Sequence, residues 1–276
     1  MEPLAPLATA ELFLPLHDEL IALLRGLSPA DWERRTAADA WRVRDVAAHL
    51  LDVQLRRLSA QRDGHLPAPD EPIRGYAGLV RFLDRLNADW VRAARRLSPR
   101  LLVDLLEPAG PAVAALVGAL PPHAPALFAV SWAGESGSES WFDVGREYTE
   151  LWHHQMQIRD AVGAPLLLER RWLHPLLELS VRALPRAYAG LDAAAGSAVV
   201  LEVEGEAGGA WSVVREADGW RVFGGAAPAP AAGVRLDADA AWRLFFNAPA
   251  AARERAVIAG DPALAAPLFA ARAVMV

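Results

Sequence analysis

The chain has 276 residues, a hydrophobic fraction of 53% and a formal net charge of -6, a composition typical of a folded protein long enough for two domains. It contains no cysteine and no lysine, which excludes disulfides, thiolate ligands, a cysteine nucleophile and a lysine Schiff base. The arginines are scattered along an acidic chain, and this argues against a nucleic-acid-binding surface.

Apolar side chains recur at helical spacing through the first 190 residues. This periodicity predicts five helices, over residues 10–27, 43–62, 76–97, 143–162 and 170–188. Ser28-Pro29 and Ser98-Pro99 each place a capping serine before a proline at a first helical position, which predicts two further helix starts. We therefore expect a mostly helical bundle in this part of the chain.

Residues 108–134 contain no Asp, Glu or Arg and are long enough to raise the question of a membrane span. Their prolines are expected to break a continuous helix repeatedly, so the segment is predicted to be buried connecting structure, with no membrane partner. The N-terminus lacks the basic segment of a secretory signal. A cytoplasmic location is the resulting expectation.

After Gly190 the pattern becomes short and alternating. Strands are predicted over residues 198–203, 210–214 and 219–223, separated by Gly-rich or Asp-Gly turns. Residues 224–233 are expected to form an exposed loop, and residues 237–246 and 261–272 to form helices on the sheet. We therefore expect an α+β protein, with a helical domain over residues 1–190 and a small α+β domain over residues 191–276.

The strongest candidates for functional residues are Glu150 and His154, which lie four residues apart in the predicted helix 143–162. Residues at this spacing share a helix face. His49 lies in a second helix whose apolar pattern would turn it toward a bundle interior. Two histidines and one carboxylate form an open metal site. His153 lies about 100° around the helix from His154 and is not expected to be a ligand.

Two segments resemble a known family: Trp41-Arg-Val-Arg-Asp-Val-Ala-Ala-His49-Leu, and the stretch Arg146 to Gly163 that contains Glu150 and His154. They are similar to the mycothiol-dependent maleylpyruvate isomerase family of the DinB-like metalloprotein superfamily. The resemblance implies a DinB-like four-helix bundle in which His49, Glu150 and His154 bind a divalent metal, with Zn²⁺ expected. It also implies a sterol-carrier-like C-terminal domain, which the segment Gly260 to Leu264 resembles.

The resemblance further implies a low-molecular-weight thiol, mycothiol or an analogue, as cofactor. The expected reaction is isomerisation or conjugation of a small electrophilic substrate, with maleylpyruvate-type cis–trans isomerisation as the family's example. Arg253 and Arg255 are candidates for binding a substrate carboxylate, because guanidinium geometry matches carboxylates; surface charges near a turn are the alternative. No catalytic residue can be named from the sequence, and the oligomeric state stays open.

Two other functions remain possible at this point. The protein is alternatively a non-catalytic, metal-stabilised binding or stress-response module whose C-terminal domain holds an apolar ligand. A further alternative is that the protein is a non-haem iron enzyme, since two histidines and one carboxylate also suit Fe(II). Metal identity together with thiol dependence would separate the three.

Overall fold

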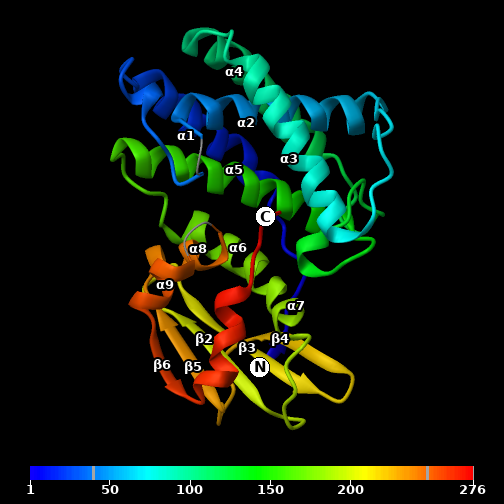
Figure 1. Cartoon of the computed structure of the whole chain (residues 1–276), viewed down its shortest axis with the longest axis vertical. Helices are drawn as coiled ribbons and strands as arrows, with labels where there is room; N and C mark the ends of the chain where they lie inside the picture. The colour runs from blue at the N-terminus through cyan, green and yellow to red at the C-terminus, as the bar shows by residue number, and fades with distance from the viewer. Residues whose placement is uncertain (39–40, 247–248, 276) are drawn as a thin grey trace. The chain divides into compact units, whose positions relative to one another are not determined.

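The structure is a computed structural model that describes residues 1–38, 41–246 and 249–275. It combines helices with one six-stranded sheet (Figure 1), which confirms the predicted α+β class. The contacts divide the chain into two compact units. Unit 1 consists of Met1–Leu7, Phe128–Thr149 and Leu167–Val276, and unit 2 of Ala8–Leu127 and Glu150–Leu166. The predicted domain boundary at residues 190/191 stays a prediction.

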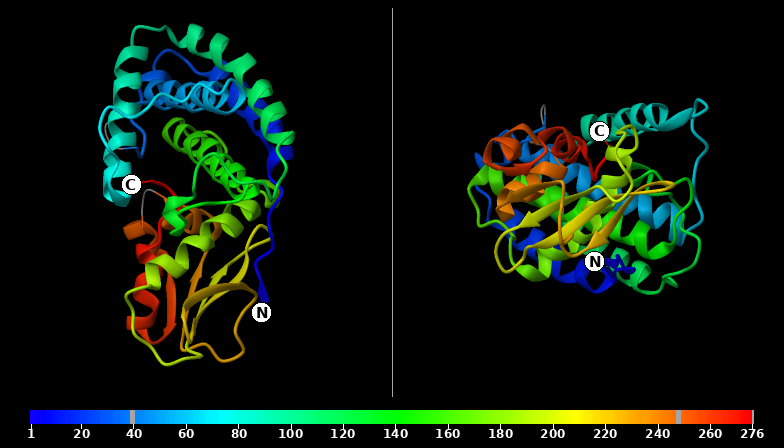
Figure 2. Two further views of the ribbon diagram at one scale, coloured as in Figure 1. Left: turned by 90° about the vertical axis from the view of Figure 1, so that its right-hand side faces the viewer. Right: turned by 90° about the horizontal axis from the view of Figure 1, so that it is seen from below.

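Unit 2 is helical (Figure 2). It contains helices α1 (Phe13–Gly26), α2 (Val43–Arg57), α3 (Gly75–Ala94), α4 (Pro99–Gly118) and the Glu150–Val162 part of α5 (Ser140–Val162). Helices α1 and α2 both pack against α4, and α3 packs against α2. The predicted helices 10–27, 43–62 and 76–97 are confirmed. The extension of the second of them to residue 62 is a π-helical turn, Leu58–Arg62. The DinB type of the bundle stays a prediction.

Helix α4 is where the sequence prediction was wrong. It begins as predicted, with the Ser98 hydroxyl accepting the Leu101 N–H and Pro99 in the first turn. It then continues through Pro108 and Pro111 to Gly118, whereas residues from 108 onward were expected to be interrupted. An interior proline costs about 3 kcal/mol. Burial of each large apolar side chain contributes roughly 1.5–3 kcal/mol, and α4 buries several of them: Leu102, Val103, Leu106, Val113 and Val117. Packing therefore outweighs the two prolines.

By length and composition alone, α4 is the one helix in the described part of the chain that could cross a membrane. Its mean hydropathy is 1.5, and 39% of the scanned window is buried in the fold. Because α4 packs against both α1 and α2, its apolar composition fits a core helix. The other predicted helix start, Ser28-Pro29, was wrong, since a three-residue 3-10 turn, Asp31–Glu33, follows it.

Unit 1 contains the sheet, in the order β1-β4-β3-β2-β5-β6. The strands are β1 (Glu2–Pro3), β2 (Ala198–Val203), β3 (Gly209–Glu216), β4 (Gly219–Gly224), β5 (Ala232–Leu236) and β6 (Val257–Gly260). Strands β2 and β5 are parallel, and the other neighbours are antiparallel. The three predicted strands are confirmed, whereas β1, β5 and β6 were not predicted.

The helices of unit 1 are the Ser140–Thr149 part of α5, α6 (Arg170–Ser180), α7 (Leu184–Tyr188), α8 (Ala238–Phe245), α9 (Pro249–Arg255) and α10 (Pro262–Ala265). The predicted helix 170–188 is interrupted by a 3-10 turn, Val181–Ala183. Helix α6 packs on α8, and α7 packs on β4. Helices α8 and α10 confirm the two predicted after residue 236, although the second continues as a 3-10 turn, Ala266–Ala270. The sterol-carrier-like character of this region stays a prediction.

Candidate metal centre

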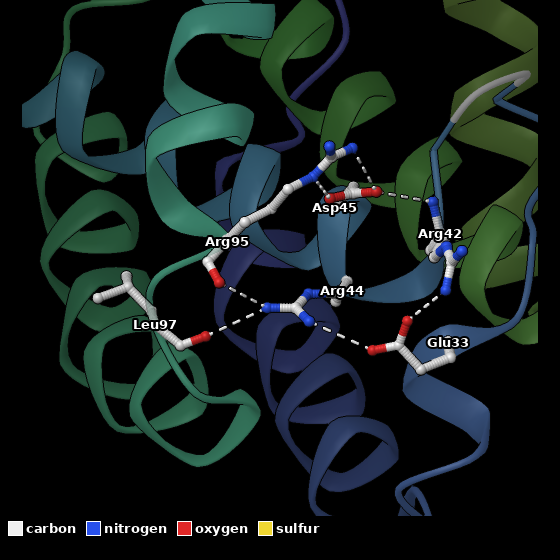
Figure 3. Close-up of polar contacts among 6 residues, drawn as sticks. All are labelled: Glu33, Arg42, Arg44, Asp45, Arg95 and Leu97. Carbon is white, nitrogen blue, oxygen red and sulfur yellow. Dashed lines mark hydrogen bonds and ion pairs between the residues drawn. The ribbon is translucent and has the colours of Figure 1, made fainter.

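The first turn of α2 is fixed by a polar network (Figure 3). Asp45 accepts the backbone N–H of Arg42 at 3.1 Å, which caps the helix. The same carboxylate accepts the Arg95 Nε–H, also at 3.1 Å, and Arg44 donates to the Arg95 carbonyl at 3.0 Å. The start of α2 is therefore joined to the end of α3. His49 follows Asp45 by one helical turn, so this network also sets its position.

Helix α5 supplies Glu150 and His154, one turn apart on the same face as predicted. The His154 Nε2 atom lies 3.2 Å from Glu150 Oε2. Arg159, five residues after His154, donates to the Glu19 carboxylate of α1 at 2.9 Å. This buried guanidinium fixes the rotation of the Glu150–Val162 part of α5 within unit 2.

The structure brings the three predicted ligands together. One ligand atom from each of His49, Glu150 and His154 lies within 4.8 Å of the others. The ring centroids of the two histidines are 4.6 Å apart, with an edge-to-face angle of 78°. His49 is 4% exposed, and the other two are partly buried. Within the described residues, this is the cluster of His and carboxylate side chains whose spacing suits a metal ion.

The charge state of the site suits a cation. Burial holds the pKa of His49 well below its usual value of 6.5, and electrostatic interactions with His154 and Arg56 lower that pKa further. His49 is therefore neutral, as a metal ligand must be, and its buried Nδ1 has no hydrogen-bond partner in the described part of the chain. When the proton of His154 is on Nδ1, its Nε2 lone pair faces the Glu150 carboxylate oxygen at 3.2 Å, and the two repel each other unless a positive charge lies between them. The donor set thus fits a divalent ion.

Trp41 lies beside the metal ligands. Its ring centroid is 5.0 Å from that of His49 and 6.4 Å from that of His154. The indole is partly exposed, so it forms an apolar wall at the side of the site rather than part of the core. Large aromatic side chains more often pack in the core, so this position beside the site is unusual for a tryptophan.

Gln157 is a site residue that the sequence analysis did not identify. Its Oε1 lies 2.8 Å from His154 Nδ1, and its Nε2 lies 3.1 Å from His153 Nε2. The sequence does contain a signal, because Gln157 follows His154 by three residues and His153 by four, and these spacings place helical side chains in contact. His153 is 2% exposed and lies outside the ligand cluster.

Two other histidines and the two candidate arginines lie outside this cluster. The buried His17 ring packs against Gly110 of α4, and His174 contacts backbone carbonyls near residue 208. Arg255 is engaged by two carboxylates, Asp237 at 2.6 Å and Asp239. The Arg253 guanidinium lies 5.3 Å from the centre of the Phe269 ring. Substrate binding by these two arginines stays a prediction; the ion pairs of Arg255 favour a structural role for it.

Comparison with known proteins places this geometry in context. Residues 13–159 match the model of the mycothiol maleylpyruvate isomerase N-terminal domain. A crystal structure of a mycothiol-dependent maleylpyruvate isomerase is similar in fold, with a TM-score of 0.52 and 14% sequence identity. A mutant of such an isomerase gives a TM-score of 0.50 and 13% identity. Both comparisons cover 88% of this chain and 91% of the other.

No curated protein sequence matches the chain. The matched domain nevertheless spans more than half of the 276 residues and contains all three converging side chains, His49, Glu150 and His154. The fold similarity extends beyond that domain to most of the chain. The chain therefore belongs to the family defined by the mycothiol maleylpyruvate isomerase N-terminal domain.

Proposed function

We propose that the protein is a metal-dependent enzyme that uses a low-molecular-weight thiol to isomerise or conjugate a small electrophilic substrate. Mycothiol is the thiol we expect, and cis–trans isomerisation of a maleylpyruvate-type substrate is the reaction we expect. The observation that carries the proposal is the convergence of His49, Glu150 and His154 within 4.8 Å in a chain of this family.

The donor set supports zinc as the metal. Three nitrogen and oxygen ligands from the protein, with further positions open, are typical of catalytic zinc, whereas structural zinc sites are closed by four protein ligands. When bound, such an ion acts as a Lewis acid that lowers the pKa of a thiol and stabilises the thiolate. The chain contains no cysteine, so none of its own side chains competes with an external thiol for an open position.

The residues of the chain have separate tasks in this proposal. Burial keeps the His49 imidazole neutral, so that its lone pair is available to the ion. Glu150 supplies the negative charge that makes a divalent cation preferable to a neutral occupant. The partly exposed Trp41 indole, beside both imidazoles, covers one side of the ion with apolar surface. In a drier site the attraction between ion and thiolate is stronger.

The test is metal replacement followed by thiol addition. Protein loaded with Co²⁺ should show a visible spectrum typical of nitrogen and oxygen ligands. Added mycothiol should produce a new sulfur-to-metal charge-transfer band, together with turnover of maleylpyruvate that requires the thiol. Glutathione serves as the comparison thiol. A Co²⁺ spectrum that no thiol changes would contradict the proposal.

One outcome would narrow the proposal, and another would replace it. A thiol-dependent charge-transfer band without maleylpyruvate turnover would favour a transferase that conjugates another electrophile. Activity with Fe²⁺ and oxygen, without any thiol, would favour a non-haem iron enzyme, which the same donor set also suits. The cytoplasmic location, and the absence of nucleic-acid and membrane partners, stay predictions.

A further inference from the structure

Three consecutive contacts on α5 connect the proposed metal centre to a buried histidine that is not one of its ligands. Glu150 Oε2 lies 3.2 Å from His154 Nε2, and Gln157 Oε1 lies 2.8 Å from His154 Nδ1. Gln157 Nε2 then lies 3.1 Å from His153 Nε2. Gln157 is 1% exposed and His153 2% exposed, so solvent water does not compete for these contacts.

The chemistry of the amide determines the direction of each hydrogen bond. An amide oxygen only accepts, so His154 Nδ1 carries the hydrogen and donates it to Gln157 Oε1. The His154 lone pair is then on Nε2, the atom that faces Glu150. The amide NH₂ only donates, so His153 Nε2 accepts and the proton of His153 lies on Nδ1. With a metal ion on His154 Nε2, this arrangement of protons satisfies both contacts of the Gln157 amide.

The reversed amide would have the opposite effect on the site. With the NH₂ group toward His154, Nδ1 would have to accept, and the proton of a neutral His154 would move to Nε2. A protonated Nε2 cannot bind a metal ion. The contact with His153 suits either orientation, because a neutral imidazole can accept or donate at Nε2. Binding of a metal ion at His154 Nε2 is what requires the orientation described here. The direction of one buried amide therefore decides whether His154 presents a lone pair to the site.

We propose that Gln157 is the positioning residue of the metal centre: its amide holds the His154 imidazole with the Nε2 lone pair toward Glu150 and His49, and the NH₂ group of that amide donates to His153. This inference rests on the proposed metal-dependent function. It adds a function for a buried polar side chain, Gln157, that does not bind the ion itself. Groups that orient a ligating histidine in this way typically contribute 10–100-fold to metal affinity.

The experiment measures metal affinity in full-length variants by competition with a chromophoric chelator. Gln157→Leu removes both hydrogen bonds at similar side-chain volume, and we expect its affinity for Zn²⁺ to fall about 10–100-fold. Gln157→Glu retains an acceptor for His154 Nδ1–H and should recover most of that loss. Gln155→Leu is the matched control, because Gln155 is equally buried on the same helix and its amide donates to the Leu16 carbonyl of α1 instead.

The possible outcomes distinguish failure of the inference about Gln157 from failure of the proposed metal-dependent function. Weak binding by Gln157→Leu alone, with recovery in Gln157→Glu, supports the inference. Equal affinity of Gln157→Leu and the wild type overturns the inference and leaves the metal centre in place. An equal loss in Gln155→Leu also overturns it, because the effect would then be general destabilisation of α5. A wild type that binds no Zn²⁺ overturns the metal centre itself and the inference with it.

A measurement on the wild type covers the case in which Gln157→Leu does not fold. In ¹⁵N-labelled, Zn²⁺-loaded protein, the ring nitrogens of His154 should show the proton on Nδ1 and the metal-shifted signal on Nε2. His153 should show its proton on Nδ1 as well. The opposite tautomer at His154 would overturn the inference regardless of how any variant behaves.

Discussion

The contact between Gly110 of α4 and His17 of α1 leads to a quantitative prediction about the helical unit. A Cβ atom added at Gly110 would lie 2.2 Å from Cγ and 2.3 Å from Nδ1 of the His17 ring, far inside van der Waals contact. The ring is 2% exposed and therefore has little space into which it can move. We expect Gly110→Ala to destabilise the protein because α1 and α4 must separate or the ring must leave its position.

The magnitude follows from two opposing terms. Alanine in a helix interior is more favourable than glycine by about 1 kcal/mol, whereas overpacking a filled core costs about 1–3 kcal/mol. The clash involves the base of a rigid ring and not the end of a flexible chain, so the cost lies near the upper limit. The net loss is about 2 kcal/mol, to be measured by urea unfolding followed by circular dichroism.

Gly118 provides the matched control. It belongs to the same helix, and a Cβ added there would meet no atom within 4 Å, so Gly118→Ala should change stability by about 0.5 kcal/mol or less. In a His17→Ala background the Gly110→Ala change should no longer destabilise, which a double-mutant cycle would measure as coupling. A Gly110→Ala protein as stable as the wild type would refute the packing of α1 on α4 described above.

Three further predictions concern stability and exposure. Burial lowers the pKa of His17 and of His49 below 6.5, so in the metal-free protein the unfolded state binds more protons below that pH. The contribution of these histidines to stability should be constant above about pH 7.5 and fall at lower pH by up to about 1.4 kcal/mol per pH unit per histidine; equal urea midpoints at pH 7.5 and 5.5 would contradict this. Ser98→Ala removes the cap of α4 and should cost about 0.5–2 kcal/mol, whereas an unchanged midpoint would mean that the cap is dispensable. A protease of broad specificity should cut first in exposed, non-regular segments such as residues 64–74, 192–197 and 225–231; early cleavage within α5 would contradict the fold.

Much of the site could be predicted because its spacing is local. Glu150 and His154 share a face of one helix at any packing geometry, and the apolar pattern around His49 showed which side of α2 is buried. The role of Gln157 was less apparent, since glutamine at a helical position is usually solvated. Its burial depends on how the Glu150–Val162 part of α5 packs in unit 2. The sequence pattern of that helix does not predict this packing.

The errors in the predicted fold also arise from packing and pairing that the local sequence pattern does not reveal. Pro108 and Pro111 were expected to end a helix on local grounds, but packing of α4 against α1 and α2 compensates for the lost hydrogen bonds. Strand β5 begins inside the Gly- and Pro-rich stretch 224–233, because its pairing with β2 is parallel and comes from a distant part of the chain. Short edge strands such as β1 carry too few residues for an alternating pattern.

The most direct test of the proposed metal centre is elemental analysis of protein purified without added metal. We expect about one divalent ion per chain in the wild type. His49→Ala and His154→Ala should each lose most of it, because each removes one of three ligands, whereas His153→Ala should keep most of it. Since packing and not the metal supplies most of the bundle's stability, the metal-free variants should remain helical by circular dichroism. A wild type without metal, or full metal retention by the His154→Ala protein, would contradict the proposed centre.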